Sequence, residues 1–432
     1  MVGTLSAMLS RKVIIFLSAV APLFLPVCAQ DVLTWEDCFA RAVSNNLNLS
    51  VGRIRLEEAE AALKSQRSVF LPDVSASGSY GTSGAKNKGD SDWSSRDSTS
   101  VRLNASYVLF DGFGNRARVS RSEAELYAEI ANFDQTCANV EYQLRRAFAQ
   151  QLYAQELIVL AENIAKRRED NVRLIEMRYK GGRENKGSLL LNQAQYRQSL
   201  YDVEEAKRAL TLARRQLATL MGDAVYEEFV LSGELFADVP PADVAMNELA
   251  ADTPTYRSAE ANVKAAEQGF VITRSARFPT ISANGSAGRS GNSHLENKNW
   301  SASVSASVPL FQGGKLVQDT IAAGLRRERS RLSAEQTMLD LLNSLQESLN
   351  SYMDRYASMG VQEEMLRAAE MRAEVARAQY RQGLVSFQDW DTIENSLINS
   401  QKSWLLSRRN ANQSAAAWRN TLGLSSIKID IE

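Results

Sequence analysis

The strongest constraint on the fold is an internal repeat, because the second half of this 432-residue chain resembles the first. The segment LPDVSASGSYG at 71–81 matches FPTISANGSAG at 278–288, an offset of 207 residues. Farther along, LFDG at 109–112 matches LFQG at 310–313, at an offset of 201. Matches in separate blocks at nearly constant offset indicate a tandem duplication of one large unit.

The placement of proline predicts the shape of that unit. After residue 30, proline occurs only at positions 72, 240, 241, 254, 279 and 309, so the spans 73–239 and 310–432 contain none. Very long helices are therefore possible in both spans, since proline is the residue that most disrupts a helix interior. Each repeat is predicted to run helix, strand, loop, strand, very long helix, tight turn, helix.

The expected bounds follow from this pattern. The first repeat, 30–223, has a helix at about 33–69, strands at 72–83 and 99–110, and helices at 113–179 and 186–221. The second repeat, 245–423, has a helix at about 245–276, strands at 279–288 and 299–311, and helices at 314–380 and 387–421. A linker at 224–244 joins the repeats, and 424–432 is a short tail. The first long helix carries apolar residues at alternating spacings of four and three, which is typical of a coiled-coil seam: Leu126, Ile130, Phe133, Cys137, Val140, Leu144 and Ala147.

The N-terminus has the features of a secretory signal peptide at 1–29. Arg11 and Lys12 precede an apolar run, and Val27-Cys28-Ala29 resembles a cleavage site. A transmembrane anchor, or a lipid anchor on Cys28, are the alternatives. Export makes disulfides permissible, but Cys38 and Cys137 are better interpreted as buried small apolar residues.

The strands alternate between apolar and polar residues, which predicts one apolar and one wet face. Strands of about ten residues with this pattern suit a transmembrane barrel with its apolar side toward lipid. Four strands cannot close a barrel alone, and open edges are not tolerated in lipid, so several chains must share one barrel. The predicted lipid-facing residues are Val101, Leu103, Tyr107, Leu109, Val304, Val308 and Leu310.

Over essentially its whole mature length the chain resembles TolC-type outer-membrane efflux proteins. The resemblance depends on the repeat, on the strand ends LFDG (109–112) and LFQGG (310–314), and on the turn AQYRQGLVSFQDW (378–390). It implies a mainly α fold with a small β part, in which a homotrimer forms a twelve-stranded barrel in the outer membrane of a Gram-negative bacterium, continued by a periplasmic α-helical barrel. The implied function is a passive conduit for drug efflux or type I secretion. The implied partners are a periplasmic adaptor, an inner-membrane pump of RND or ABC type, and outer-membrane lipid.

The resemblance also implies two kinds of site at the turns between the long helices. The adaptor-docking tips correspond to Gly181 and Gly182 in the first repeat. In the second repeat they correspond to Gly383, Leu384 and Val385. The periplasmic aperture corresponds to Asp389, Tyr380 and Asp391.

The chain departs from the family's pattern at three aperture positions, so the complete salt-bridge lock is not expected here. Thr392 stands at the second acidic position, Val385 at that of an arginine, and Ser188 at that of an aspartate. Threefold symmetry would still gather three copies of an inward-facing Asp389, and clustered carboxylates attract cations. The alternative is that Asp389 merely favours a helix N-terminus.

Other classes of function find little support in the sequence. The sole histidine, His294, lies in a predicted strand–strand loop without metal-ligand spacing. No nucleophile–base pair or phosphate-binding glycine loop is recognisable, so neither an enzyme nor a cofactor is predicted. A formal net charge of −1 gives no reason to expect a nucleic-acid partner. A periplasmic coiled-coil scaffold or adhesin without channel activity is the alternative to the conduit.

Overall fold

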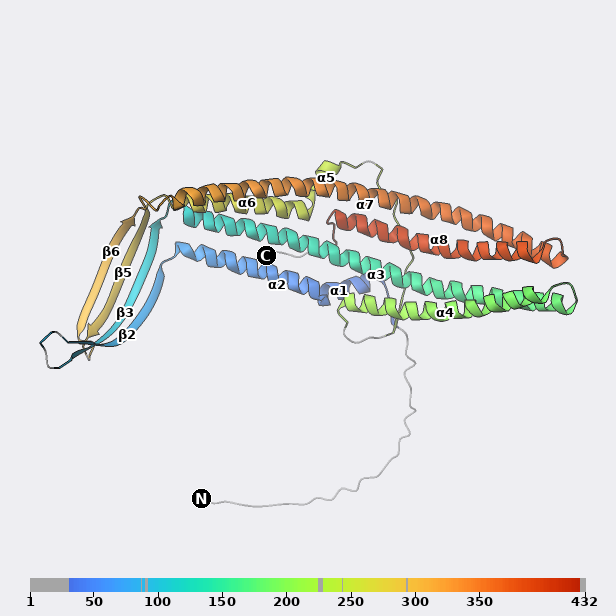
Figure 1. Cartoon of the computed structure of the whole chain (residues 1–432), viewed down its shortest axis with the longest axis horizontal. Coiled ribbons are helices and arrows are strands. Elements are labelled where there is room, and N and C mark those ends of the chain that lie inside the picture. Colours follow the sequence, from blue (N-terminus) through green and yellow to red (C-terminus); the bar gives the residue numbers. More distant parts are fainter. Residues whose placement is uncertain are drawn as a thin grey trace, which may run out of the picture.

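The computed structural model is an elongated molecule with a β-sheet at one end and long helices extending from it (Figure 1). It describes residues 31–86, 88–89, 92–223, 228–242, 244–292 and 294–427. The predicted signal peptide, and with it Cys28, lies outside the described residues.

Two helical hairpins make up most of the length. The first consists of α3 (Gly114–Lys180) and α4 (Lys186–Met221), the second of α7 (Lys315–Gln382) and α8 (Phe387–Thr421). The longest two, α3 and α7, have 67 and 68 residues, so each extends for about 100 Å at 1.5 Å per residue. No described helix is long and apolar enough to cross a membrane.

The shorter helix of each repeat is broken, contrary to the prediction of one continuous helix. The first repeat has α1 (Trp35–Asn45) and α2 (Leu47–Arg67), and the second has α5 (Met246–Asp252) and α6 (Pro254–Ser275). Asn46 causes the first break, because its side chain accepts hydrogen bonds from the backbone of Asn48 and Leu49 and so starts a new helix. In the second repeat Thr253 caps α6, and Pro254 occupies its first turn, where proline is tolerated.

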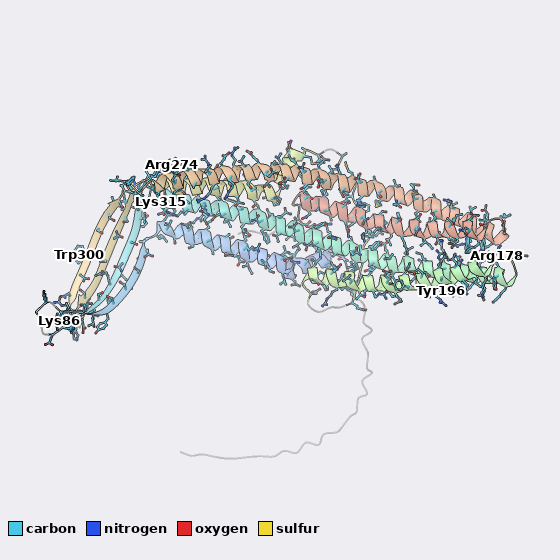
Figure 2. All side chains as sticks on the ribbon, viewed as in Figure 1. Lys86, Arg178, Tyr196, Arg274, Trp300 and Lys315 are labelled. Atoms are coloured by element: carbon cyan, nitrogen blue, oxygen red, sulfur yellow. The ribbon has the colours of Figure 1, made fainter. Side chains whose placement is uncertain are left out.

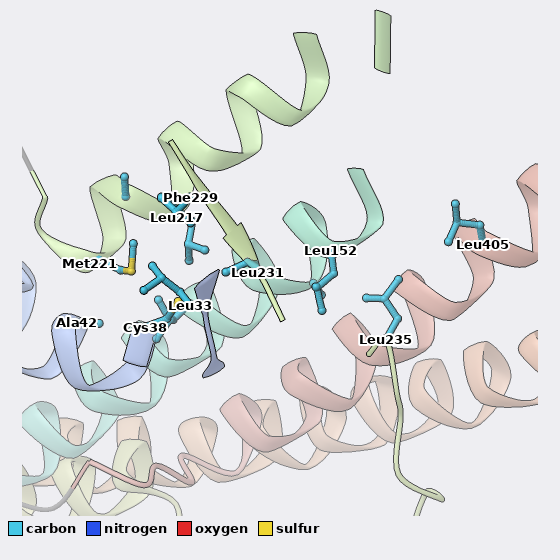
Figure 3. Close-up of a cluster of buried hydrophobic side chains, with 13 residues drawn as sticks. Leu33, Cys38, Ala42, Leu152, Leu217, Met221, Phe229, Leu231, Leu235 and Leu405 are labelled. Carbon is cyan, nitrogen blue, oxygen red and sulfur yellow. The ribbon is translucent and has the colours of Figure 1, made fainter. Parts of the chain in front are cut away.

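A small layer packs on the side of the hairpins, and it includes part of the segment predicted to be a linker. The strand β1 (Asp31–Leu33) pairs in parallel with β4 (Phe229–Leu231). Residues 229–237 are therefore part of the structure's core rather than a simple connection. Their buried side chains join those of α1, α3, α4 and α8 in the cluster of Figure 3, which includes Leu33, Cys38, Ala42, Leu144, Leu152, Leu217, Met221, Phe229, Leu231, Leu235 and Leu405.

Both described cysteines are free and buried. Burial raises the pKa of Cys38 to about 12 and that of Cys137 to about 11. The thiolate is the reactive form, so both thiols are chemically inert at neutral pH. Cys137 packs with Phe133 and Val140 of the predicted coiled-coil seam and with Leu49 of α2.

The sheet has four antiparallel strands in the order β2 (Asp73–Ala85), β3 (Ser94–Phe110), β5 (Thr280–Gly291) and β6 (Asn297–Ser307). Each repeat contributes one hairpin, and β3 meets β5 in the middle. The ladder between β2 and β3 extends to Ala85 and Ser94, so the loop between them is shorter than the predicted 84–98.

The register places the apolar residues of all four strands on one face. Tyr107 lies opposite Ala283, which lies opposite Val304. On the other face serine hydroxyls meet across the strands, as in the 2.9 Å hydrogen bond between Ser286 and Ser301. The remaining members of the apolar face include Val74, Ala76, Tyr80, Val101, Leu103, Ala105, Ala287, Trp300 and Ala302.

Three of the predicted lipid-facing residues do not occupy regular strand positions. A β-bulge between Val108 and Phe110 shifts the register, so Phe110 rather than Leu109 lies opposite Ile281. Val308 and Leu310 lie beyond the end of β6 at Ser307. Pro309 explains this end, because proline has no N–H to donate to a strand ladder.

The C-terminal segment is held by a buried carboxylate on α3. Glu141 is 2% exposed, and it accepts hydrogen bonds from the backbone N–H of Ser426 at 2.6 Å and the hydroxyl of Ser425 at 3.1 Å. Arg145 forms a 2.8 Å ion pair with it. Burial alone would raise the pKa of Glu141, but these donors outweigh burial and lower it below its ordinary value of 4.5.

We predict that Glu141→Gln destabilises the protein by about 1.5–3 kcal/mol at pH 7, the usual range for hydrogen bonds to a charged group. Because the folded-state pKa is lowered, the carboxylate stabilises the fold above pH 4.5, and this stabilisation is lost as the pH falls through the folded-state value. Thermal melting followed by circular dichroism should therefore show a difference between wild type and variant that shrinks on acidification. The exposed Glu57→Gln is the control; a pH-independent difference would contradict the prediction.

Candidate functional site

The two turns between the long helices form the end of the molecule farthest from the sheet, where Figure 2 labels Arg178. Gly182 and Gly383 adopt left-handed φ values of 68° and 81°, and each ends its helix in the manner typical of glycine. Asn185 and Ser386 then cap the following helices by accepting hydrogen bonds from backbone N–H groups.

A buried aromatic stack supports the second turn from inside. The rings of Tyr380 and Trp390 are parallel, with centroids 4.4 Å apart, and the two side chains are 1% and 0% exposed. Ile175 of α3 and Ala376 of α7 complete this cluster, so it contacts both hairpins. Val385, a predicted docking residue, is only partly buried and packs against the cluster.

Tyr380 also joins the tips of the two hairpins by polar contacts. Its hydroxyl donates a 2.8 Å hydrogen bond to Glu184 in the first turn. Arg178 of α3 donates to the Tyr380 carbonyl at 2.7 Å and lies over its ring, 4.5 Å from the centroid. Burial, followed by the hydrogen bond to Glu184, raises the pKa of Tyr380, so the phenol keeps its proton and acts as the donor.

A buried ionic network lies beside this contact. Glu394 of α8 is 1% exposed and pairs with Arg377 of α7 at 2.7 Å and Arg167 of α3 at 3.8 Å. Asp391 of α8 forms a 3.5 Å ion pair with Arg168. Burial lowers the pKa of Arg168, while Asp391 and Glu394 act in the opposite direction.

The predicted aperture residues therefore have different environments. Tyr380 is buried between the hairpins, and Asp391 accepts hydrogen bonds from Gln195 at 3.2 Å and Asn395 at 3.0 Å. Asp389 is exposed and accepts a 2.6 Å hydrogen bond from the Ser386 hydroxyl. Of the predicted docking residues, Gly181, Gly182, Gly383 and Leu384 are exposed at the turns.

Several residues of this site were not predicted from the sequence. Glu184 accepts the hydrogen bond from Tyr380, whereas Ser188, at the family's aspartate position, is buried. The sequence does mark Glu184 in one respect, because it is the only carboxylate in the turn 181–185. Trp390 gave no comparable signal, because an aromatic residue near a helix start is common, and Glu394 was marked only as one of two acids that flank Thr392. In the described ranges no group of three or more His, Cys, Asp or Glu residues could hold a metal ion.

We predict that Glu394→Gln destabilises the contact between the hairpins by about 3–5 kcal/mol, the usual cost of removing one partner of a buried ion pair. Arg167 and Arg377 would then lose their shared counter-charge. Hydrogen exchange should show faster exchange in α8 and in the tip half of α3. Glu374→Gln, an exposed change one helical turn before Arg377, should leave exchange unchanged. Equal exchange in both variants would contradict this.

Comparison with known proteins identifies the family. The family of outer membrane efflux proteins matches residues 39–223 and 245–424, which together cover most of both repeats. Nodulation protein T of Rhizobium leguminosarum bv. trifolii is 21% identical, over 90% of this chain and 84% of its own length. Cation efflux system protein CusC of Escherichia coli O157:H7 is 25% identical, over 85% of this chain and 80% of its own.

The fold has solved counterparts. A crystal structure of CusC superimposes with a TM-score of 0.82 at 18% identity, covering 90% of this chain and 91% of that one. The family is one of export channels rather than of enzymes, and its members act in the outer membrane of Gram-negative bacteria. This chain belongs to the outer membrane efflux protein family.

Proposed function

We propose that three copies of this chain form the outer-membrane channel of a tripartite export system, and that the channel is a passive conduit. The observation that carries the proposal is the sheet, which has an apolar face, a hydroxyl face and two edge strands, β2 and β6, each with a single neighbour. An open edge is not tolerated in lipid. Pairing β6 of one copy with β2 of the next would give a closed barrel of about twelve strands.

The height of the apolar face supports a membrane position. On β5 this face begins at Ile281 and ends at Arg289, which lies opposite Lys298 of β6. The last apolar residue before Arg289 is Ala287, six steps from Ile281, so the apolar part spans about 20 Å along the strand and the charged pair lies about 27 Å from Ile281. Transmembrane barrels have an apolar band about 25 Å tall. The hydroxyl face would then line a water-filled lumen.

The helical tips are proposed to meet the rest of the export system. Gly181, Gly182, Gly383 and Leu384 are exposed there, and Leu384 is 71% exposed although it is apolar. An exposed apolar side chain at a turn suits a periplasmic adaptor. An inner-membrane pump of RND or ABC type would supply the energy and select the cargo.

The contacts around Tyr380 are proposed to hold the periplasmic end in its closed form. They attach the tip of α7 and α8 to that of α3 and α4, so an outward movement of one hairpin must break the Tyr380–Glu184 hydrogen bond. Three copies of Asp389 would form a ring of negative charge at the narrowest point. Such a ring would favour cations.

We predict that Tyr380→Phe raises the mean conductance in planar bilayers about fivefold, which corresponds to the loss of about 1 kcal/mol for one hydrogen bond. The phenyl ring preserves the stack on Trp390, so the substitution removes only the donor. Tyr201→Phe, on the exposed side of α4, is the matched control. Unchanged conductance in Tyr380→Phe would show that this hydrogen bond does not restrain opening.

We predict that the protein fractionates with outer membranes as a detergent-requiring trimer. In that trimer, we predict that Asp389→Asn lowers the preference of the channel for potassium over chloride. Substitution by asparagine removes the charge but keeps an acceptor for Ser386. Reversal potentials in a KCl gradient measure the preference. A soluble protein without conductance would refute the channel and favour a periplasmic scaffold. A conducting trimer with unaltered selectivity would refute only the role of Asp389.

A further inference from the structure

A groove of about 720 Å³ lies along α3, between α4 and α8, about halfway along the molecule. Its lining is rich in side-chain amides and contains two arginines, Arg146 of α3 and Arg409 of α8. None of its lining residues carries a carboxylate. By contrast, three arginines near the tips, Arg167, Arg168 and Arg377, each form an ion pair with an acid of α8.

The two guanidinium groups lack counter-charges. Among the described contacts the side chain of Arg146 has no hydrogen bond or ion pair, and it is exposed into the groove. Arg409 donates only to the neutral oxygens of Gln150, at 3.2 Å, and Asn410, at 2.9 Å. Its Nε is buried without a partner. The preceding Arg408, by contrast, forms a 2.6 Å ion pair with Glu156.

Arg409 is nevertheless held in a fixed position. Its guanidinium lies 4.7 Å from the centre of the Tyr153 ring, and Gln150 orients one of its Nη atoms. Burial lowers the pKa of Arg409; Tyr153 acts in the opposite direction, and the nearby charge of Arg146 lowers the pKa further. The fold therefore accepts an electrostatic cost to keep two arginines close together, a cost that a bound anion would remove.

The groove opens on the side of α3 away from the layer of α1, β1 and β4. Phe148 faces that layer, where its ring contacts Trp35 edge-on at 5.5 Å. Gln155 faces it too and exchanges two hydrogen bonds with the backbone of Leu231. Arg146 is two residues from Phe148, which is about 200° around the helix. If the helices form a tunnel wall, that layer must lie outside, since it would otherwise fill the lumen. The groove then faces inward.

We propose that this groove is an oxyanion-binding subsite in the wall of the tunnel, in which Arg146 and Arg409 contact carboxylate or phosphate groups of passing solutes. The inference rests on the proposed channel function for the direction in which the groove faces. Guanidinium groups bind both kinds of oxyanion through paired N–H donors, and the surrounding amides can donate further hydrogen bonds. Threefold symmetry would place six arginines at one level of the tunnel.

Calorimetric titration of the full trimer in detergent tests the proposal without requiring conductance. The probes are citrate, which carries carboxylates, and inorganic tripolyphosphate. We expect the wild type to bind at least one of them, and the probe that binds identifies the kind of group recognised. Arg146→Gln and Arg409→Gln should each weaken binding about tenfold, and the double variant should abolish it. Arg409→Lys keeps the charge but loses the planar fork, so its affinity for the probe should lie between those of the wild type and Arg409→Gln.

Arg372→Gln is the control. It removes an exposed arginine of α7, outside the groove, and should bind the probe as the wild type does. Heat-modifiability gels confirm that each variant still forms the trimer. A wild-type trimer that binds neither probe would overturn the subsite, as would binding that survives in the double variant. Neither result contradicts the proposed channel function if the trimer conducts. Failure to form a conducting trimer at all would instead refute the proposed function.

Discussion

The architecture depends on the need of every strand to find hydrogen-bond partners on both sides. The four-stranded sheet satisfies its interior ladders, but β2 and β6 each retain one unpaired edge. Its apolar face is exposed, with Val304 at 70% and Trp300 at 81%. Neither the edges nor this face is stable in water as an isolated unit. Closure with other copies in lipid, as proposed above, would satisfy both requirements together, and the helices would share the same symmetry because they continue directly from the strands.

The side layer of α1, β1 and β4 explains how the two repeats are held in register midway along the helices. Its core brings Leu33 and Phe229 against α3 and α4, and Leu235 against Leu405 of α8. Gln155 of α3 satisfies the backbone of Leu231, because its side-chain amide donates to the Leu231 carbonyl and accepts from the Leu231 N–H. This part of the structure joins the first and second hairpins by apolar contacts, so it is the fixed region from which the tips extend.

Much of the fold could be predicted because its signals are periodic. The absence of proline allowed α3 and α7, and strand alternation indicated the two faces of the sheet. The parts that were missed depend on single local features. Asn46 breaks a helix only because its side chain caps the next one and donates to Leu220. The register shift at Leu109 comes from a bulge, for which one sequence gives no rule.

The site shows the same division. The turns and Tyr380 could be located from glycine placement and family resemblance. The carboxylate that Tyr380 contacts could not, because Glu184 lies in a turn of different sequence and only the fold brings it within 2.8 Å. The buried Glu394 was likewise indistinguishable from the many exposed acids of the helices, since burial of a charge depends on arginines that come from two other helices.

The contacts within each helical hairpin differ in chemistry from the contacts between the hairpins, and this difference decides which of them can separate. Toward the tips, the two helices of each hairpin pack together through small apolar residues, such as Ala161 with Val203 and Ala373 with Leu397. Contacts between the hairpins include the apolar cluster of Ile175 with Tyr380 and Trp390, but also many polar contacts, such as Lys402 with Asp202 at 3.0 Å. Water can replace polar contacts at little net cost, whereas separating packed apolar side chains exposes them to water. In the proposed channel, each hairpin would therefore move as a unit, and opening would occur at the seam between them.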